Sequence, residues 1–167
     1  MKAQPRKGNT YPRWMALLAS QRWLRGVIIK VFAPIDRVVF RLSKGRRGLS
    51  PGRAVLVLTT TGRKTGQPRS NPVLYVDDPP RLWVMASNYG RENHPAWSGN
   101  LLADPRARVE VAGERREVIA RLATAEERRE MWPRLLELYP AWKNYETWTD
   151  REFRLFCLEP GNGSATG

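Results

Sequence analysis

The sequence predicts a mainly β domain of the α+β class, preceded by a basic helical arm. Six short apolar segments are separated by turn-forming residues, which is typical of an antiparallel barrel or sandwich. Two segments with helical spacing interrupt these strands, and most of the excess positive charge lies ahead of the first strand. A chain of 167 residues has the length of one domain with an appendage.

The first 53 residues carry nearly all of the net charge. The whole chain has 29 Lys and Arg against 16 Asp and Glu, which gives a formal net charge of +13. Residues 1–53 contain 13 of the basic residues and a single acid, Asp36. The remainder is therefore nearly neutral, and the basic segment needs its own explanation.

We expect residues 1–10 to be a disordered basic tail and residues 11–52 to form a basic amphipathic helical arm, divided at Pro34. The apolar stripe of this arm can pack on the main domain or lie on an anionic membrane surface with Trp14 and Trp23 as anchors. Nucleic acid is a third partner for the charge, but no aromatic-basic platform supports it. No stretch reaches the ~20 apolar residues of a membrane span.

The main domain is predicted over residues 53–160, followed by a Gly- and Ser-rich tail at 161–167 that we expect to be disordered. The near-continuous apolar run at 53–60 indicates a strand that is buried on both faces. The six predicted strands span residues 53–60, 69–76, 82–86, 107–111, 117–122 and 153–158.

Two helices are predicted between these strands. The first begins near His94, with a proline at an early position, and ends at Asp104. The second begins with a capping box, in which Thr124 and Glu127 satisfy each other's backbone N–H groups. We expect Pro133 to kink or break this second helix.

The chain has one cysteine, Cys157, and one histidine, His94. A single cysteine excludes an internal disulfide and a thiolate metal cluster, and it fits a reducing compartment such as the cytoplasm. A single histidine excludes sites that need a pair of histidines, and we interpret it as a structural residue. We therefore expect no metal and no catalytic triad.

A basic segment rich in Gly and Thr joins the first two predicted strands. Residues 59–69 read Thr-Thr-Thr-Gly-Arg-Lys-Thr-Gly-Gln-Pro-Arg, which is not the order of a P-loop. The glycines allow close approach of the backbone to a ligand, and the hydroxyl and cationic groups suit a phosphate or carboxylate. The alternative is a plain hairpin turn whose charges are solvated.

Two further segments are candidates for ligand contact. Residues 86–101 lead from a strand into a helix, where Ser87 and helix N–H groups favour an anion or a ring carbonyl. Further along, Tyr139, Trp142 and Tyr145 recur every three residues, so a helix or 3₁₀ turn would align them as a ladder. Such a ladder suits a flat, partly polar ring, or else closes the end of a barrel.

Together the three segments resemble the deazaflavin (F420)-dependent nitroreductase family, a branch of the split β-barrel flavin/deazaflavin oxidoreductases. The matches run in order over residues 54–160 and also include Asn71-Pro72, Ala86-Ser87-Asn88, Pro95-Ala96-Trp97, Asn100-Leu101, Asp104-Pro105 and residues 148–151. The resemblance implies a split β-barrel of six or seven mostly antiparallel strands. It also implies coenzyme F420, an 8-hydroxy-5-deazaflavin with a phosphate and an oligoglutamate tail.

The resemblance also implies roles for individual residues. Catalytic hydrogen bonds would come from Ser87, Tyr139 and Tyr145. The substrate pocket would be walled by Leu74, Tyr139, Trp142 and Tyr145, of which Leu74 and Trp142 replace tyrosines of the family. The expected coenzyme-binding residues are Thr61, Gly62, Arg63, Lys64, Thr65, Gly66, Arg69, Pro72, Ser87, Trp97 and Asn100.

The function implied by this family is hydride transfer from reduced F420 to a quinone, a nitroaromatic compound or another conjugated acceptor. The main task of the protein would be to hold two rings face to face. The alternatives are an FMN-dependent split-barrel reductase and a non-catalytic carrier of F420 or lipid. We expect a cytoplasmic protein whose arm places it at the inner face of the cell membrane, where lipid quinones reside.

Overall fold

The structure, a computed structural model, describes residues 54–161. The predictions for the basic tail, the helical arm and the C-terminal tail lie outside these residues and stay predictions. Within the described part of the chain, no helix is long and apolar enough to cross a membrane.

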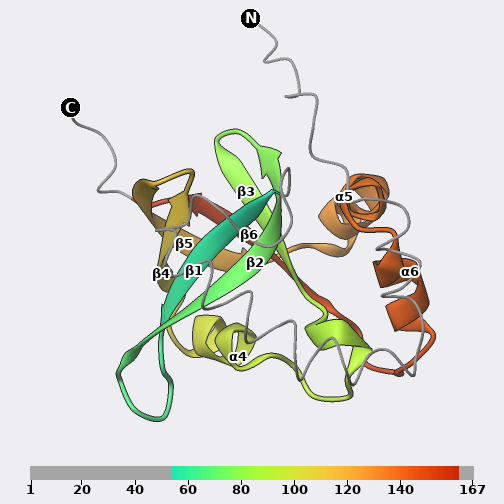
Figure 1. Ribbon diagram of the computed structural model, residues 1–167, viewed down its shortest axis with the longest axis horizontal. Helices are drawn as coiled ribbons and strands as arrows, with labels where there is room; N and C mark the ends of the chain where they lie inside the picture. Colours follow the sequence, from blue (N-terminus) through green and yellow to red (C-terminus); the bar gives the residue numbers. More distant parts are fainter. Residues whose placement is uncertain (1–53, 162–167) are drawn as a thin grey trace, which may run out of the picture.

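Six strands close into an antiparallel barrel, as the sequence predicts (Figure 1). The order around the barrel is β1-β2-β3-β6-β5-β4, and β1 pairs with β4 to complete the closure. The strands are β1 (Val55–Thr61), β2 (Pro68–Asp78), β3 (Arg81–Ala86), β4 (Arg106–Val111), β5 (Glu114–Leu122) and β6 (Arg154–Pro160).

The first strand shows why a barrel differs from a layered sheet. Leu56 and Leu58 are 0% exposed in the barrel interior, whereas Val55 and Val57 alternate with them and are only half-buried. A barrel strand presents one face to the interior and the other to the outside. The prediction that this run is buried on both faces is therefore corrected to burial of one face.

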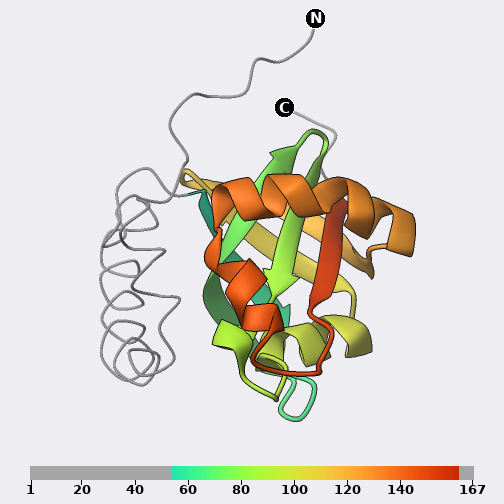
Figure 2. The same ribbon diagram turned by 90° about the vertical axis from the view of Figure 1, so that its right-hand side faces the viewer.

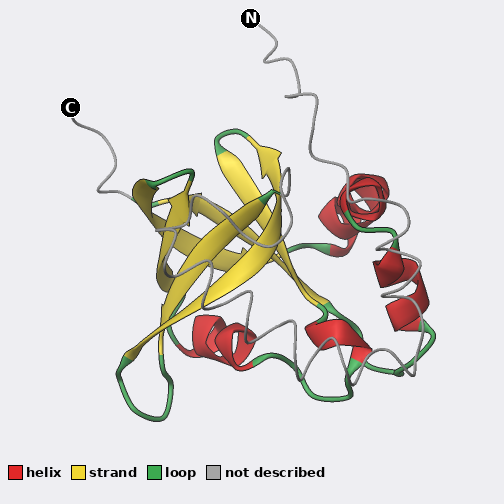
Figure 3. Ribbon diagram, in the orientation of Figure 1, coloured by secondary structure: helices red, strands yellow, loops and turns green. Residues whose placement is uncertain are grey.

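The helices cover one end and one side of the barrel (Figure 3). Helix α4 (Ala96–Ala103) lies at the end that carries the hairpin between β1 and β2. Figure 2 shows α5 (Ala125–Leu138) lying across one side of the barrel, with α6 (Ala141–Glu146) between it and the short 3₁₀ helix η2 (Asn88–Gly90). A second apolar core, beside the barrel interior, fills the space under α5 and α6.

The predicted limits of the helices need two corrections. Helix α4 begins at Ala96, because Pro95 takes an extended conformation and caps it. Helix α5 starts at the predicted capping box but continues through Pro133 to Leu138. The last turns bury Leu135 and Leu138 in the second core, and this burial outweighs the backbone hydrogen bond that proline cannot donate.

An ion pair at the start of α5 makes a prediction for acid stability. Glu127 accepts hydrogen bonds from Arg121 at 2.7 Å and from the backbone N–H of Thr124 at 2.9 Å. These contacts, the one with Arg121 above all, lower the pKa of Glu127 from 4.5 to about 2. A carboxylate with a lowered pKa adds stability above pH 4.5, and this contribution is lost as the pH falls toward 2.

We therefore expect Glu127→Gln to lower the free energy of unfolding at pH 7 and to flatten its decline between pH 4.5 and 2. Urea unfolding at a series of pH values measures both effects. Glu114→Gln, which alters an exposed ion pair in a hairpin, is the matched control. If the free energy of unfolding of Glu127→Gln fell between pH 4.5 and 2 as steeply as that of the natural chain, the prediction would be wrong.

Candidate functional site

The hairpin between β1 and β2 is a tight, hydrogen-bonded turn. The N–H of Gly62 donates to the carbonyl of Gln67 at 2.8 Å, and Gly66 has a positive φ of 66°. A Cβ atom on Gly62 would lie 2.8 Å from the hydroxyl oxygen of Thr65, which is too close for any other residue without movement. The sequence therefore fixes the shape of this loop through its glycines.

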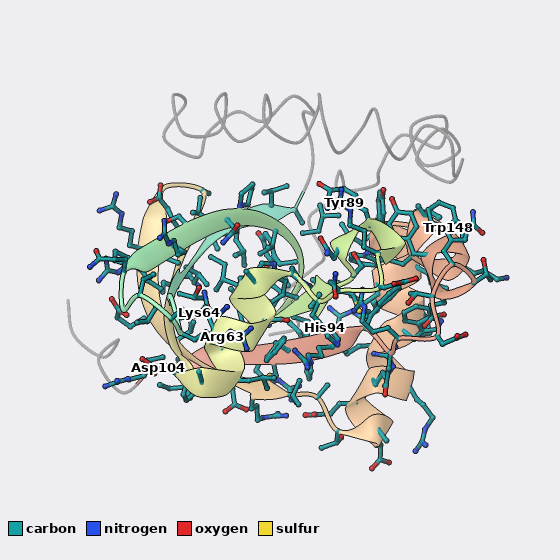
Figure 4. All side chains as sticks on the ribbon, turned by 90° about the horizontal axis from the view of Figure 1, so that it is seen from below. Arg63, Lys64, Tyr89, His94, Asp104 and Trp148 are labelled. Carbon is teal, nitrogen blue, oxygen red and sulfur yellow. The ribbon has the colours of Figure 1, made fainter. Side chains whose placement is uncertain are left out.

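Helix α4 clamps the hairpin through one buried amide. The Asn100 side chain donates to the Thr60 hydroxyl at 3.0 Å and accepts the backbone N–H of Arg63 at 3.1 Å. The Arg63 guanidinium lies against Gly99, where a Cβ atom would be 3.3 Å from its central carbon. Figure 4 shows Arg63 and Lys64 beside α4. Asn100 thus positions the basic turn.

The basic groups of this hairpin are available to a ligand. Arg63, Lys64 and Arg69 are exposed, and none of them pairs with a carboxylate in residues 54–161. The exposed arginines of β4 and β5 differ, since Arg108 and Arg115 each contact a glutamate at 3.0 Å or less. A turn with exposed cationic side chains and no carboxylate partner among the described residues suits a phosphate or carboxylate.

A second group of predicted residues lies where β3 ends. The indole N–H of Trp142 on α6 donates to the Ser87 hydroxyl at 3.0 Å. This bond fills an acceptor position on the serine oxygen and leaves its O–H to donate, and no acceptor for it occurs among the described residues. Trp142 therefore supplies a donor that positions the Ser87 hydroxyl.

The aromatic residues pack as a cluster and not as a parallel ladder. Tyr139 lies before α6, whereas Trp142 and Tyr145 lie on it, and all three are buried. The hydroxyls of Tyr139 and Tyr145 are 2.8 Å apart, and the Tyr139 ring meets the Trp142 ring edge-on at 5.4 Å. The two phenols are joined by a hydrogen bond, so a proton on one can pass to the other.

Arg151 is a positioning residue that the sequence alone did not single out. Its guanidinium donates to the carbonyls of Ser87 at 2.8 Å, Arg91 at 2.9 Å and Ala86 at 3.3 Å. It also lies 2.9 Å from Nδ1 of His94. This side chain holds the whole turn after β3, including Ser87. Separations of 57 to 65 residues leave no local signal in the sequence for these contacts.

The remaining predicted residues lie within the barrel wall and its core. Trp97 is buried and packs on Phe156, with ring centroids 5.8 Å apart. Pro72 and Leu74 are half-buried on β2, between the hairpin and the aromatic cluster, and Thr61 ends β1. The site therefore consists of a basic hairpin and an aromatic cluster, connected by β2 and β3.

The thiol of Cys157 is far from reactive. It is 0% exposed in β6, and burial raises its pKa to about 11. Within the described ranges no three His, Cys, Asp or Glu side chains are grouped so that they could hold a metal ion.

Comparisons with known proteins agree with this geometry. Residues 36–160 match the family described as F420H(2)-dependent quinone reductase. The Mycobacterium tuberculosis protein Rv3178 is 32% identical over 120 residues, which cover 72% of this chain and 98% of that protein. The F420H(2)-dependent quinone reductase Rv1261c of the same organism is 33% identical over 102 residues, which cover 60% of this chain and 68% of that protein.

Solved structures show the same architecture. The structure of an F420-H2 dependent reductase, FDR-A, has a TM-score of 0.59 at 33% identity and covers 64% of this chain and 95% of its own. A domain-swapped dimer has a TM-score of 0.61 at 29% identity and covers 82% of this chain and 97% of its own. By its sequence match, its relatives and its split barrel, this chain belongs to the F420H(2)-dependent quinone reductase family.

Proposed function

We propose that this F420-dependent reductase acts on quinones, and that nitroaromatic and other conjugated acceptors enter the same pocket. The observation that carries the proposal is the hydrogen bond from Trp142 to the Ser87 hydroxyl, because it leaves the Ser87 O–H to donate to a bound acceptor. A quinone that accepts a hydride develops negative charge on its oxygen. Hydrogen-bond donors already in place stabilise that charge without reorganisation.

The basic hairpin fits the acidic part of coenzyme F420. Arg63, Lys64 and Arg69 would hold the phosphate and the first carboxylates of the tail, and Gly62 and Gly66 allow the backbone to approach. Asn100 would act through Arg63, whose N–H it fixes. When bound and reduced, the deazaflavin supplies a hydride from its C5 position.

The protein would contribute orientation and proton delivery. Pro72 on β2 would contact the coenzyme, and Leu74 and Trp142 would wall the acceptor pocket. Ser87 would donate to the oxygen on which charge develops. Tyr139 and Tyr145 would relay a proton through their shared hydrogen bond.

The direct test of this proposal mixes the full chain with reduced F420 and a water-soluble menaquinone analogue. Oxidation of the coenzyme is followed by its returning absorbance, and a nitroaromatic compound is the second acceptor. We expect the quinone to be reduced faster than in the reaction without protein. A protein that binds F420 but leaves the oxidation rate unchanged with both acceptors would disprove the proposal.

The role of Ser87 gives a sharper prediction. We expect Ser87→Ala to lower kcat about 100-fold, the usual effect of removing one donor to a developing oxyanion. The affinity for F420 should change much less than kcat, because Ser87 is one of many expected coenzyme contacts and the hairpin binds the acidic part. Trp142→Phe, which removes the indole N–H, should lower kcat by a smaller factor in the same direction.

Ser70→Ala is the control, since the Ser70 hydroxyl bonds Thr59 at 2.9 Å on an exposed part of the hairpin strands. Steady-state kinetics with a quinone give kcat, and fluorescence titration gives the affinity for F420. If Ser87→Ala and Ser70→Ala had equal kcat values, Ser87 would have no role in the reaction.

A further inference from the structure

A second basic cluster lies away from the hairpin, in a hollow of ≈ 400 Å³. Three arginines line this hollow, Arg128, Arg151 and Arg154, together with His94. Its lining also includes apolar residues, among them Leu122, which is 45% exposed, and the buried Phe153. The hollow therefore combines cationic and apolar side chains.

The positive charges in this hollow are poorly balanced. Its one acidic side chain, Glu152, lies 3.4 Å from Arg128 and pairs with it. Arg151 donates to carbonyl groups and to His94, all of them neutral. Arg154 contacts the Ser98 hydroxyl at 3.4 Å, and no carboxylate within residues 54–161 pairs with either Arg151 or Arg154.

The uncompensated charges act on one another. Burial lowers the pKa of His94, and the charges of Arg151 and Arg154 lower it further. Burial and the nearby Arg154 also lower the pKa of the Arg151 guanidinium. Like charges are held close together here, and a negative group between them would remove that cost.

We propose that this hollow binds a small anion that carries a carboxylate or phosphate group, with Arg154 and His94 as its ligands. The guanidinium of Arg154 has five N–H donors, and one contact with Ser98 uses a single nitrogen. Nδ1 of His94 accepts from Arg151, so the neutral ring carries its proton on Nε2 and can donate it. The apolar lining residues suit the hydrocarbon part of such a molecule.

Two sources could supply this chemistry. A free small acid is one, and the other is the oligoglutamate tail of the coenzyme. The second is plausible in geometry because Arg63 contacts Gly99 and Arg154 contacts Ser98, so both basic clusters border the first turns of α4. The anion site itself does not rest on the proposed function, because phosphate binding can be measured without any reaction.

The single histidine makes the test direct. The imidazole C–H signals of His94 in the NMR spectrum of the full chain belong to one residue, so the pKa of His94 can be followed without assignment. Inorganic phosphate and glutarate are titrated at constant ionic strength, with chloride as the balancing salt. We expect both to raise the pKa of His94 in a saturable manner, because a bound anion offsets Arg151 and Arg154.

Arg154→Gln separates this site from non-specific binding. We expect it to raise the pKa of His94 in the absence of any anion and to weaken binding of phosphate about tenfold or more, the effect of losing a charged hydrogen bond. Arg154→Lys keeps the charge and should retain part of the affinity. Arg116→Gln, in an exposed pair with Glu114, should bind phosphate as the natural chain does.

F420 with and without its oligoglutamate tail distinguishes the two sources. A change at His94 that requires the tail identifies the coenzyme as the source of the carboxylate, and a response to glutarate alone identifies a free acid. The proposal is overturned if none of the probes changes the pKa of His94, or if Arg154→Gln responds to phosphate as strongly as the natural chain. Quinone reduction, measured separately, would be unaffected by that failure.

Discussion

Replacement of both Arg63 and Lys64 by alanine should weaken binding of F420 about 100-fold or more, since each hydrogen bond to a charged group contributes about 1.5–3 kcal/mol. Both side chains are exposed and have no carboxylate partner in the described part of the chain. They therefore break no ion pair among residues 54–161 when they bind an anion. The expected loss is large for surface residues, because the ligand is the only strong partner they have.

Fluorescence titration of F420 measures this effect, and its salt dependence adds an independent check. The natural chain should lose affinity steeply with added salt, whereas the double variant should depend on salt less. The control is the double variant Arg115→Ala and Arg116→Ala, which removes two positive charges at the start of β5, next to another hairpin turn. If this control weakened binding equally, general attraction and not the β1–β2 hairpin would account for the affinity.

Arg151→Met is expected to lower the free energy of unfolding by about 2 kcal/mol or more, because it leaves several partly buried carbonyls without a donor. Methionine keeps much of the side-chain length, and its contact with Phe153 can persist where the guanidinium now lies 4.8 Å from the ring. The change therefore removes mainly the hydrogen bonds. The turn that carries Ser87 should become mobile, and kcat should fall.

Urea unfolding gives the free energy of unfolding, and kinetics at low temperature give kcat for the folded variant. Arg151→Lys should recover only part of the stability, since an ammonium group cannot match the planar fork that reaches Ser87 and Arg91 together. Arg116→Met is the control at an exposed site. A midpoint for Arg151→Met equal to that of the control would show that the turn holds its shape without this arginine.

The barrel could be read from the sequence because its determinants are local. Alternating apolar residues mark β4 and β5, and the turn residues between strands separate them. Gly62 and Gly66 shape the basic hairpin, and Thr124 with Glu127 fixes the start of α5. In each case a few neighbouring residues carry the whole signal.

The parts that escaped prediction depend on contacts between distant segments. The bond from Trp142 to Ser87 spans 55 residues, and no spacing rule links an indole to a serine at that distance. The hydrogen bonds from Arg151 to the turn after β3 also join distant segments, since Arg151 and Ser87 are 64 residues apart. Pro133 marks the opposite case, in which a strong local signal was overridden by burial of Leu135 and Leu138.

The buried thiol of Cys157 is a natural probe of local opening in the native protein. Cys157 lies in the middle of β6, paired with Trp83 on β3 and Arg121 on β5. The residue is 0% exposed and its side chain packs in the second core with Leu135 and Leu138 of α5, so an alkylating reagent can reach the sulfur only when this core opens. The rate of labelling in native buffer therefore reports the opening of the core between α5 and β6, with no engineered probe.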